Sequence, residues 1–315
     1  MNKILVTGGA GNIGSALIAK LVMKDNNDVV IVDDLSTGFI NKLPSKEQGN
    51  WTFIKADVNN YKDISEIILS HQFDYVFHFA AMVGVQRTQD NPVKVLNDID
   101  GIKYVLTLSK NTSVKRVFFS SSSEVYGEPV VLPQHEHTTP LNSRIPYAIV
   151  KNVGESFCKS YFQEYGLDYT VFRFFNTYGP NQSTDFVVAR FLALALKNQD
   201  ITIYGDGSQI RTFTYVDDTV DTCLKCFYEN KIINDVINIG NDKIMTVIDL
   251  AQLIIKMTNS SSKLIHLPPL KEGDMTRRQP DNSKMREILG RELISIEEGI
   301  KRMISDSNFL KAINL

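Results

Sequence analysis

The sequence is poor in cysteine: only Cys158, Cys223 and Cys226 occur among 315 residues. Three cysteines are too few and too unevenly placed for a disulfide framework. Cys223 and Cys226 form a C-x-x-C pair, but the chain has no second pair to complete a tetrahedral metal site. The surrounding residues, DDTVDTCLKCFYEN, have the pattern of a helix. We therefore expect packing cysteines and no metal centre.

A strong charge imbalance and long apolar runs are also missing. The 34 basic residues nearly balance the 36 acidic ones, so no field favours nucleic acid or an anionic membrane. No apolar stretch approaches the length needed to span a bilayer. The start, MNKILVTGG, leads directly into an apolar run and a glycine loop, without the pattern of a secretory signal. We expect a soluble, cytoplasmic protein that binds neither nucleic acid nor membrane.

The segment QHEHTTP holds His135 and His137 on either side of Glu136, a composition that resembles a metal cluster. The segment is rich in turn-forming residues and lacks helical spacing. The sequence therefore favours a solvated loop.

What the first half does contain is an alternation of short apolar runs and helical patterns. Helical patterns such as YKDISEIILSH separate most of the runs. The alternation predicts right-handed crossovers and a parallel sheet covered by helices on both faces. We expect an α/β fold of the Rossmann, doubly wound type, with ligands at the carboxyl ends of the strands. The predicted strands cover residues 3–7, 28–34, 52–57, 74–81, 114–122 and 168–176.

The second half predicts a smaller, mixed α/β part. It contains helical stretches such as FVVARFLALALKN, a candidate short hairpin, ITIYGDGSQIRTFTYV, and one more buried strand, DVINIG. We assign residues 1–176 to the Rossmann domain, with residues 213–241 returning to it. Residues 177–315 are assigned to a C-terminal substrate domain. No low-complexity linker separates the two, so we expect close packing between them.

A glycine pattern follows the first predicted strand. Gly8, Gly11 and Gly14 form G-x-x-G-x-x-G between a strand and a helix, with Asn12 and Ile13 inside the motif. Glycine permits a tight turn and close approach of the backbone to a pyrophosphate, which the N–H groups of the helix N-terminus stabilise. The strand–turn–helix context therefore predicts a dinucleotide site.

Asp33 ends the second predicted strand, nineteen residues after Gly14. A carboxylate at this point can accept both hydroxyl groups of an adenosine ribose and would repel a 2′-phosphate, so we predict NAD rather than NADP. Asp34 follows directly and joins the predicted cofactor site. Asp57 and Val58, after the third strand, are candidates for contact with the adenine.

Tyr147 and Lys151 lie four residues apart in PYAIVKNVGE, the start of a predicted helix, so they share one face. A free tyrosine has a pKa of about 10, too high for a good base at neutral pH. A neighbouring ammonium favours the phenolate, and we predict that this pair supplies a general base. The serine run in SSSSEVYG, residues 120–127, begins at the end of the fifth predicted strand and is a candidate source of a catalytic hydroxyl.

Five motifs occur in this order along the chain: TGGAGNIG, HFAA, SSSSEVYG, PYAIVK and RFFNTYGP. They resemble the extended short-chain dehydrogenase/reductase family, and within it the NAD-dependent nucleotide-sugar epimerase/dehydratase branch. The resemblance covers nearly the whole chain and continues through GDGSQIRTFTYVDD and GDMTRRQPD. It implies that Phe79, Ala80 and Ala81 of HFAA join the cofactor site, that NAD is bound tightly, and that the protein forms a homodimer through the helix of Tyr147 and Lys151.

The resemblance also implies a mechanism. Tyr147, held near phenolate by Lys151, takes the proton from a sugar hydroxyl, usually at C4, and the hydride of that carbon passes to NAD. Ser122 occupies the position of the family hydroxyl that hydrogen-bonds the reacting oxygen. The substrate of such an enzyme is a nucleoside-diphosphate sugar. Residues that resemble the family's contacts to its diphosphate and ribose are Asn176, Arg211 and Arg278.

In the family, the positions of Ser123 and Glu124 vary with the chemistry that comes after oxidation. The 4-epimerases usually have non-acidic residues there, and the dTDP-glucose 4,6-dehydratases have Asp-Glu, from which Ser123 departs. UDP-glucuronate decarboxylases and GDP-mannose 4,6-dehydratases have a hydroxyl residue followed by glutamate, and the latter generally use NADP. The decarboxylases share the R-x-P-D sequence found at 278–281, yet usually follow it with LGW-x-P where this chain has LGRELIS.

We therefore predict an NAD-dependent enzyme that oxidises C4 of a nucleoside-diphosphate hexose, or a similar sugar, in surface-polysaccharide sugar synthesis. A 4-epimerase or 4-dehydrogenase is the first interpretation. The alternatives are a UDP-glucuronate decarboxylase and a 4,6-dehydratase that uses Glu124 as the C5 base. An alternative from another class is a non-catalytic NAD(H)-binding sensor or scaffold, against which the intact Ser122, Tyr147 and Lys151 argue.

Overall fold

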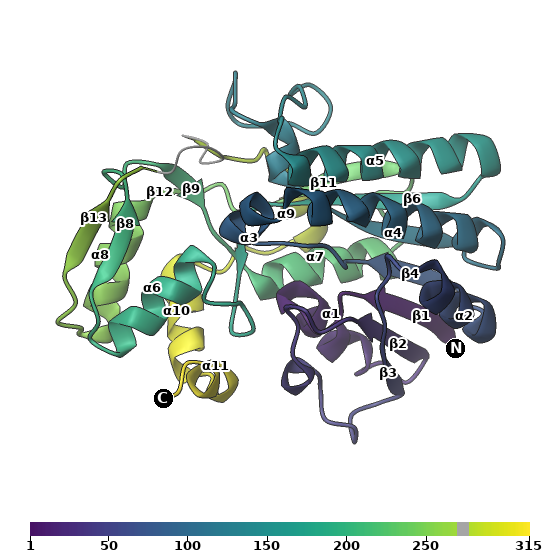
Figure 1. Cartoon of the computed structure of the whole chain (residues 1–315), viewed down its shortest axis with the longest axis horizontal. Coiled ribbons are helices and arrows are strands. Elements are labelled where there is room, and N and C mark those ends of the chain that lie inside the picture. Colours follow the sequence, from purple (N-terminus) through teal and green to yellow (C-terminus); the bar gives the residue numbers. More distant parts are fainter. Residues whose placement is uncertain (270–276) are drawn as a thin grey trace.

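The centre of the molecule is a seven-stranded parallel sheet in the order β11-β6-β5-β4-β1-β2-β3 (Figure 1). The structure is a computed structural model that describes residues 1–269 and 277–315. The predicted α/β, doubly wound Rossmann-type fold is confirmed. The strands are β1 (Asn2–Thr7), β2 (Asn27–Asp33), β3 (Trp51–Lys55), β4 (Tyr75–His78), β5 (Arg116–Ser122), β6 (Asp168–Phe174) and β11 (Asp235–Ile239).

The strand order reverses between β1 and β4. From β1 the chain builds outward through β2 and β3, and from β4 it builds in the other direction through β5 and β6. Loops on the two sides of such a reversal leave in opposite directions and open a crevice at the carboxyl ends of the strands. The glycine loop follows β1 and the HFAA segment begins in β4, so both motifs border this crevice.

Helices cover both faces of the sheet (Figure 1). Neighbouring strand residues alternate between two cores: Ile4 and Val6 pack on one side and Leu5 on the other. The buried Cys223 and Cys226 belong to the first core, as predicted for packing cysteines. The first core includes α1 (Asn12–Leu21) and α7 (Val216–Tyr228), and the second includes α2 (Tyr61–His71), α4 (Pro92–Lys110) and α5 (Pro146–Tyr165).

The second part of the molecule consists of helices and three two-stranded sheets. Its pairs are β7 (Thr177–Tyr178) with β10 (Thr214–Tyr215), β8 (Ile201–Tyr204) with β13 (Leu264–Leu267), and β9 (Ile210–Thr212) with β12 (Ile244–Thr246). Its helices are α6 (Val187–Leu196), α8 (Val247–Thr258), α9 (Ser283–Leu289), α10 (Ile296–Ser305) and α11 (Ser307–Ala312). The remaining short helices are η1 (Ile40–Lys42), α3 (Val85–Asp90) and η2 (Ser123–Tyr126).

The hairpin predicted in ITIYGDGSQIRTFTYV is wrong. Strand β8 pairs in parallel with β13, and β9 pairs antiparallel with β12, so the two strands of the expected hairpin have different partners. Gly205 and Gly207 both have positive φ, 67° and 79°, in the segment between them. These left-handed turns redirect the chain, and β9 leaves along another course.

The prediction of a solvated loop for QHEHTTP is wrong for two of its residues. Gln134 and Glu136 are buried, whereas His135 and His137 remain partly exposed. Glu136 is held inside because its Oε1 accepts a hydrogen bond of 2.9 Å from the backbone N–H of Asn238 in β11.

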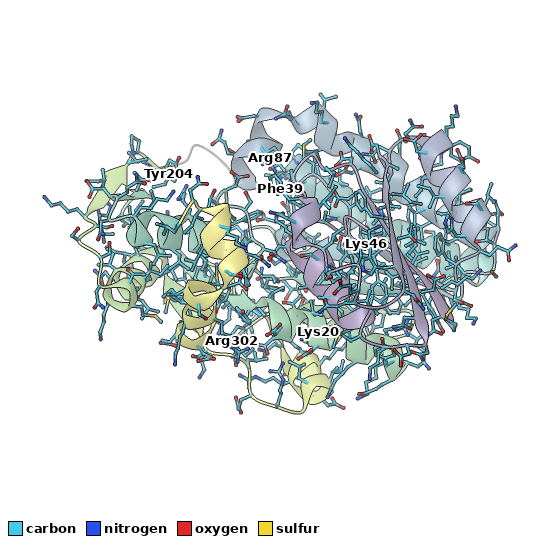
Figure 2. The ribbon with its side chains drawn as sticks, turned by 90° about the horizontal axis from the view of Figure 1, so that it is seen from below. Lys20, Phe39, Lys46, Arg87, Tyr204 and Arg302 are labelled. Carbon is cyan, nitrogen blue, oxygen red and sulfur yellow. The ribbon has the colours of Figure 1, made fainter. Side chains whose placement is uncertain are left out.

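The two parts of the molecule are joined at several points. Strand β11 returns to the main sheet beside β6. Arg302 of α10 pairs with Asp217 of α7 at 3.2 Å, and within the first part Lys20 of α1 pairs with Asp221 of α7 at 2.6 Å; Figure 2 labels Lys20 and Arg302. Each of these exposed pairs contributes little to stability. Within the described ranges, no helix is both long and apolar enough to cross a membrane.

Candidate active site

The glycine loop is shaped by contacts that leave no room for side chains. Gly8 has a φ of 68°, and a Cβ there would lie 2.5 Å from the backbone nitrogen of Ala80. A Cβ on Gly14 would collide with the carbonyl oxygen of Gly8. The first turn of α1, which contains Asn12 and Ile13, therefore packs directly against the end of β1, and its N–H groups face the crevice.

Asp33 lies at the carboxyl end of β2 and is fixed by the backbone. Its Oδ2 accepts from the N–H of Ala10 at 2.9 Å, and its Oδ1 accepts from the N–H of Leu35 at 2.8 Å. Burial raises the pKa of Asp33, and the backbone hydrogen bonds lower it in part. A Cβ on Gly38 would lie 2.8 Å from the Asp33 carboxylate, so the loop leaves the carboxylate space only because residue 38 is glycine.

The other predicted cofactor residues border the same crevice but differ in what they contact. The backbone N–H of Phe79 donates to the carbonyl oxygen of Thr7, and that of Ala80 donates to the Thr7 hydroxyl at 3.3 Å, so the segment that ends at Ala81 lies against the glycine loop. Two acids are bonded locally instead: Asp34 accepts from Ser36 and Asp57 accepts from the N–H of Asn59. Val58 is buried.

This arrangement fits a dinucleotide. The glycines keep the backbone bare at the N-terminus of α1, where a pyrophosphate would bind, and Asp33 presents a positioned carboxylate where an adenosine ribose would lie. Asn12 Oδ1 is buried and has no hydrogen-bond partner among the described residues, which leaves an acceptor at the start of the helix.

Ser122, Tyr147 and Lys151 come together from the end of β5 and the first turns of α5. Ser122 is buried, and its side chain lowers the pKa of the Tyr147 phenol. Lys151 Nζ lies 5.8 Å from the centre of the Tyr147 ring and donates to Ser120 Oγ at 3.3 Å. Ser120 therefore orients the Lys151 ammonium.

Burial dominates the electrostatics of this group. It raises the pKa of the Tyr147 phenol above its usual range, and the Ser122 side chain lowers this pKa in part. Burial also lowers the pKa of Lys151 to about 8, against the opposite effect of the Asp98 carboxylate. Ser122 is thus the group that assists ionisation of the phenol most directly in this structure.

Next to these residues lies an ion pair between distant segments. Arg278 Nη2 donates to Glu124 Oε1 at 2.8 Å, and Arg278 Nη1 donates to Ser123 Oγ at 3.3 Å. The side chains of Arg278 and Glu124 are only 6% and 15% exposed. Glu124 Oε2 is buried without a hydrogen-bond partner in the described parts of the chain. The preceding motif residues Gly273 to Thr276 lie outside the described residues.

Asn176 and Arg211 lie on segments that a side-chain hydrogen bond connects. Asn176 follows β6 with a φ of 36°, and its Nδ2 donates to the carbonyl oxygen of Thr212 at 2.9 Å. Arg211, the residue before Thr212, is buried and donates to the carbonyl oxygen of Ile210. This pair sits where the second part of the molecule meets the end of β6.

Sequence reasoning missed the groups that support the site. Asp98 of α4 is buried, accepts from the N–H of Met82 at 2.8 Å, and faces Lys151. Its signal in the sequence is an acid three residues after Val95 and four residues before Ile102, where helical spacing would favour an apolar residue. Glu155 of α5 forms an ion pair of 2.6 Å with Arg173 of β6, and no sequence pattern predicts that pairing.

Comparison with known proteins identifies relatives over the whole chain. Residues 4–240 match the model of the NAD dependent epimerase/dehydratase family. The chain is 36% identical over 307 residues to a putative UDP-glucose 4-epimerase of Methanocaldococcus jannaschii, covering 96% of this chain and 97% of that protein. It is 34% identical to a UDP-N-acetyl-alpha-D-glucosaminuronate decarboxylase of Bacillus cytotoxicus, covering 96% of each.

Among solved structures, the fold matches a UDP-glucose 4-epimerase of Thermotoga maritima with UDP-glucose. The TM-score is 0.90 at 34% identity, and 99% of both chains is covered. The glycine loop, the serine–tyrosine–lysine group and these similarities over nearly the full length all indicate the same family. The chain belongs to the NAD-dependent epimerase/dehydratase family and is an NAD-dependent enzyme of the nucleotide-sugar type.

Proposed function

We propose that this enzyme oxidises C4 of a nucleoside-diphosphate hexuronate and then decarboxylates the product. The observation that carries the proposal is the buried Ser123–Glu124–Arg278 group beside Ser122 and Tyr147. A buried ion pair costs desolvation, and a simple exchange of configuration at C4 does not need one. Its position next to the base favours a role in a second chemical step.

The first step is the same for every candidate activity. Ser122 holds the C4 oxygen, Tyr147 takes its proton, and Lys151 supplies a positive charge that favours the phenolate. When bound, NAD supplies the acceptor for the C4 hydride and returns it at the end of the cycle. Residues 8–14 would hold its pyrophosphate, and Asp33 would hold its adenosine ribose.

The second step follows from the chemistry of a 4-keto uronate. The C4 ketone and the C6 carboxylate form a β-keto acid, so the C5–C6 bond can break with its electron pair moving toward O4 as carbon dioxide leaves. Arg278 attracts the carboxylate, because a guanidinium binds carboxylates well. Glu124 takes up a proton from solvent on its unpartnered Oε2 and passes that proton to C5. The overall reaction consumes one proton.

A 4,6-dehydratase is less well supported. Loss of water from C6 requires an acid to protonate the departing hydroxyl, and Ser123 stands where such an acid would be needed. A serine hydroxyl is too weak an acid for that role.

A second candidate is a 4-epimerase. The similarity to the Methanocaldococcus protein and to the Thermotoga structure favours it. In that case the 4-keto sugar rotates within the site so that the opposite face of C4 is reduced. Tyr147 then returns the proton to the C4 oxygen. The Bacillus decarboxylase relative, which is equally well covered, favours the uronate.

In either case we propose that Asn176 and Arg211 bind the diphosphate. Arg211 offers a planar donor fork that suits phosphate oxygens. The left-handed conformation of Asn176 turns its side chain toward β9, the strand that carries Arg211.

The test is product analysis with UDP-, GDP-, dTDP- and CDP-sugars, each with and without a C6 carboxylate. We expect the uronate to lose the mass of carbon dioxide. Glu124→Gln should retain C4 oxidation and lose carbon dioxide release, whereas Glu164→Gln, an exposed glutamate of α5, should behave as wild type. A product of unchanged mass with inverted configuration at C4 would contradict the decarboxylase and support the 4-epimerase.

We also propose a homodimer that forms through α4 and α5. These helices expose Val93, Leu96 and Tyr165 on the surface, at 72%, 41% and 49%. Exposed apolar side chains on two helices that pack side by side favour association with a second copy of the chain. Sedimentation should give twice the chain mass, and Val93→Glu with Leu96→Glu should give the single-chain mass. A wild-type protein that sediments as one chain contradicts this proposal.

A further inference from the structure

The residues that carry the second step come from two segments that lie outside the main sheet. Arg278 lies just after the undescribed residues 270–276 and before α9, and Glu124 lies in η2. Their ion pair spans 154 residues of sequence. The two segments must be fixed relative to each other, because the Arg278 guanidinium could not keep its distance and orientation to Glu124 if its segment moved freely.

The segment of Arg278 is clamped through its backbone. The N–H of Gln134 donates to the carbonyl oxygen of Gln279, and the N–H of Asp281 donates to the carbonyl oxygen of Gln134, both at 2.8 Å. These two bonds form a short parallel bridge between Gln134 and Pro280. Arg278 therefore stands one residue from a two-bond clamp.

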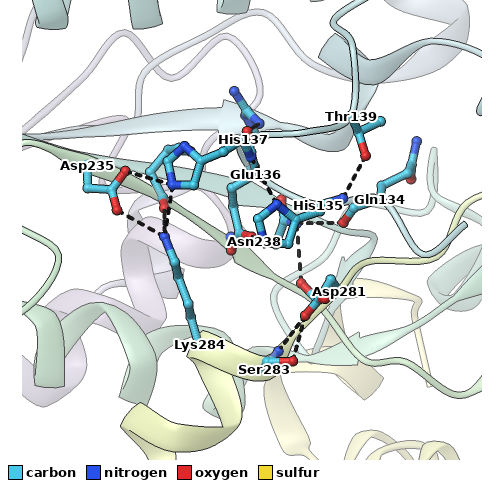
Figure 3. Close-up of polar contacts among 12 residues, drawn as sticks. Gln134, His135, Glu136, His137, Thr139, Asp235, Asn238, Asp281, Ser283 and Lys284 are labelled. Carbon is cyan, nitrogen blue, oxygen red and sulfur yellow. Dashed lines mark hydrogen bonds and ion pairs between the residues drawn. The ribbon is translucent and has the colours of Figure 1, made fainter. Parts of the chain in front are cut away.

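Asn238 of β11 joins this clamp to the main sheet (Figure 3). Its Nδ2 donates to the carbonyl oxygen of Gln134 at 2.9 Å and to that of Asp281 at 3.3 Å. Its backbone N–H donates to Glu136 Oε1 at 2.9 Å. Asn238 is fully buried, so each of these bonds forms away from water.

The same amide reaches the segment of Glu124. Asn238 Oδ1 accepts from the Tyr126 hydroxyl at 2.7 Å, and Tyr126 is the last residue of η2. The Tyr126 oxygen in turn accepts from Arg173 Nη1 at 2.8 Å. Arg173 pairs with Glu155 of α5, the helix that also carries Tyr147 and Lys151.

We propose that Asn238 is a positioning residue that sets the distance between Arg278 and Glu124, and thereby controls the step after C4 oxidation. The oxygen of the Asn238 amide accepts a hydrogen bond from the turn of Glu124, and its nitrogen donates to the segment of Arg278. A shift of about 1 Å in a reacting group can cost about 100-fold in rate. This inference rests on the proposed role of the Glu124–Arg278 pair. The hydrogen-exchange test described below does not depend on that role.

The kinetic test separates two half-reactions in single-turnover experiments with a nucleoside-diphosphate hexuronate. Near-ultraviolet absorbance of the reduced nicotinamide reports C4 oxidation, and trapped carbon dioxide reports the second step. Asn238→Ala and the isosteric Asn238→Asp should slow carbon dioxide release by about 10-fold to 100-fold. Oxidation should stay within about 2-fold of wild type, so the 4-keto species accumulates.

Asn282→Ala is the matched control. Asn282 is also buried, lies in the same segment, and donates from its side chain to a backbone carbonyl, that of Gly240 at 2.9 Å. It makes no contact with η2 among the interactions of the described residues. We expect a loss of stability like that of Asn238→Ala with an unchanged ratio of the two half-reactions. An equal change of that ratio in both variants would reduce Asn238 to a structural role.

A double-mutant cycle with Arg278→Lys, which keeps a measurable rate of carbon dioxide release, completes the kinetic test. If Asn238 acts through the ion pair, Asn238→Ala adds no further slowing once Arg278 has been replaced. Fully additive effects would overturn the inference, whereas the proposed function would stand. If the wild type releases no carbon dioxide and only inverts C4, the proposed function fails, and the same cycle is then applied to the rate of inversion.

Hydrogen exchange provides the test that does not depend on the proposed function. Asn238→Ala should speed exchange at the amides of Gln134 and Asp281, because the clamp loses its attachment to β11. Unchanged exchange at these amides would overturn the inference whatever reaction the enzyme performs.

Discussion

The two sides of the active site are built in different ways. On the cofactor side, Gly8, Asp33 and Phe79 each follow or end a strand of one parallel sheet, and neighbouring backbone groups hold them. On the other side of Tyr147, Glu124 and Arg278 meet across 154 residues, through segments outside that sheet. The first side follows from regular secondary structure, and the second depends on side-chain hydrogen bonds.

This difference predicts how substitutions divide. Changes on the cofactor side should weaken cofactor binding or abolish oxidation at C4. Changes on the side of Glu124 should leave oxidation intact and alter the second chemical step. Substitutions on each side test this division. We expect the largest effect at Tyr147, which lies between the two sides.

Tyr147→Phe should abolish the oxidation on which both sides depend. Removal of a general base costs about 10² to 10⁴-fold in rate. Single-turnover formation of reduced nicotinamide with a nucleotide sugar measures it. Tyr161→Phe is the matched control in the same helix, where the hydroxyl bonds Thr107 instead, and it should oxidise at the wild-type rate. Equal rates for Tyr147→Phe and wild type would remove Tyr147 from the mechanism.

Arg278→Lys should affect the second step only. Arg278 bonds Ser123 and Glu124 with two nitrogens of one planar group, and a lysine ammonium cannot reproduce that fork. We expect carbon dioxide release to slow by about 10-fold to 100-fold, in line with the loss of a charge-assisted hydrogen bond of about 1.5–3 kcal/mol. If oxidation slowed by the same factor, the two sides would not be separable.

Asp33→Ser should weaken NAD binding by about 10-fold, because the ribose hydroxyls lose a charged acceptor. The preference for NAD over NADP should narrow as the repulsive charge disappears. Titration of cofactor-free protein measures both constants. Asp34→Ser should have a smaller effect, because the Asp34 carboxylate is bonded to Ser36. Equal effects of the two substitutions would contradict the assignment of Asp33.

His78 makes the cofactor side sensitive to acid. It is buried at the end of β4, its Nδ1 lies 2.8 Å from Thr7 Oγ1, and burial lowers its pKa to about 3. The unfolded chain, with an ordinary pKa of about 6.5, binds more protons between these values, so stability present above pH 6.5 is lost as pH falls. The loss from this group is about 1 kcal/mol between pH 6 and pH 5.

His78→Gln should flatten that part of the pH profile, as measured by denaturant unfolding at each pH. A profile as steep as that of the wild type would show that another group is responsible.

The sequence was most informative where spacing along the chain decides the structure. The six strands of the first half, the turn at Gly8 and the helix that puts Tyr147 four residues before Lys151 all follow from local patterns. The contact between Glu124 and Arg278 does not, because it needs the bridge between Gln134 and Pro280 and the amide of Asn238. The hairpin expected near Gly205 failed for the same reason, since partners far along the chain decide which strands pair.

The role proposed for Glu124 and Arg278, after C4 oxidation and on a uronate, can be decided by one measurement. That measurement is mass spectrometry of the product formed from UDP-glucuronate by the wild type and by Glu124→Gln. We predict a product that has lost carbon dioxide with the wild type, and reduced nicotinamide without carbon dioxide release with the variant. A product of unchanged mass from both proteins, with inverted C4, would contradict the proposed role.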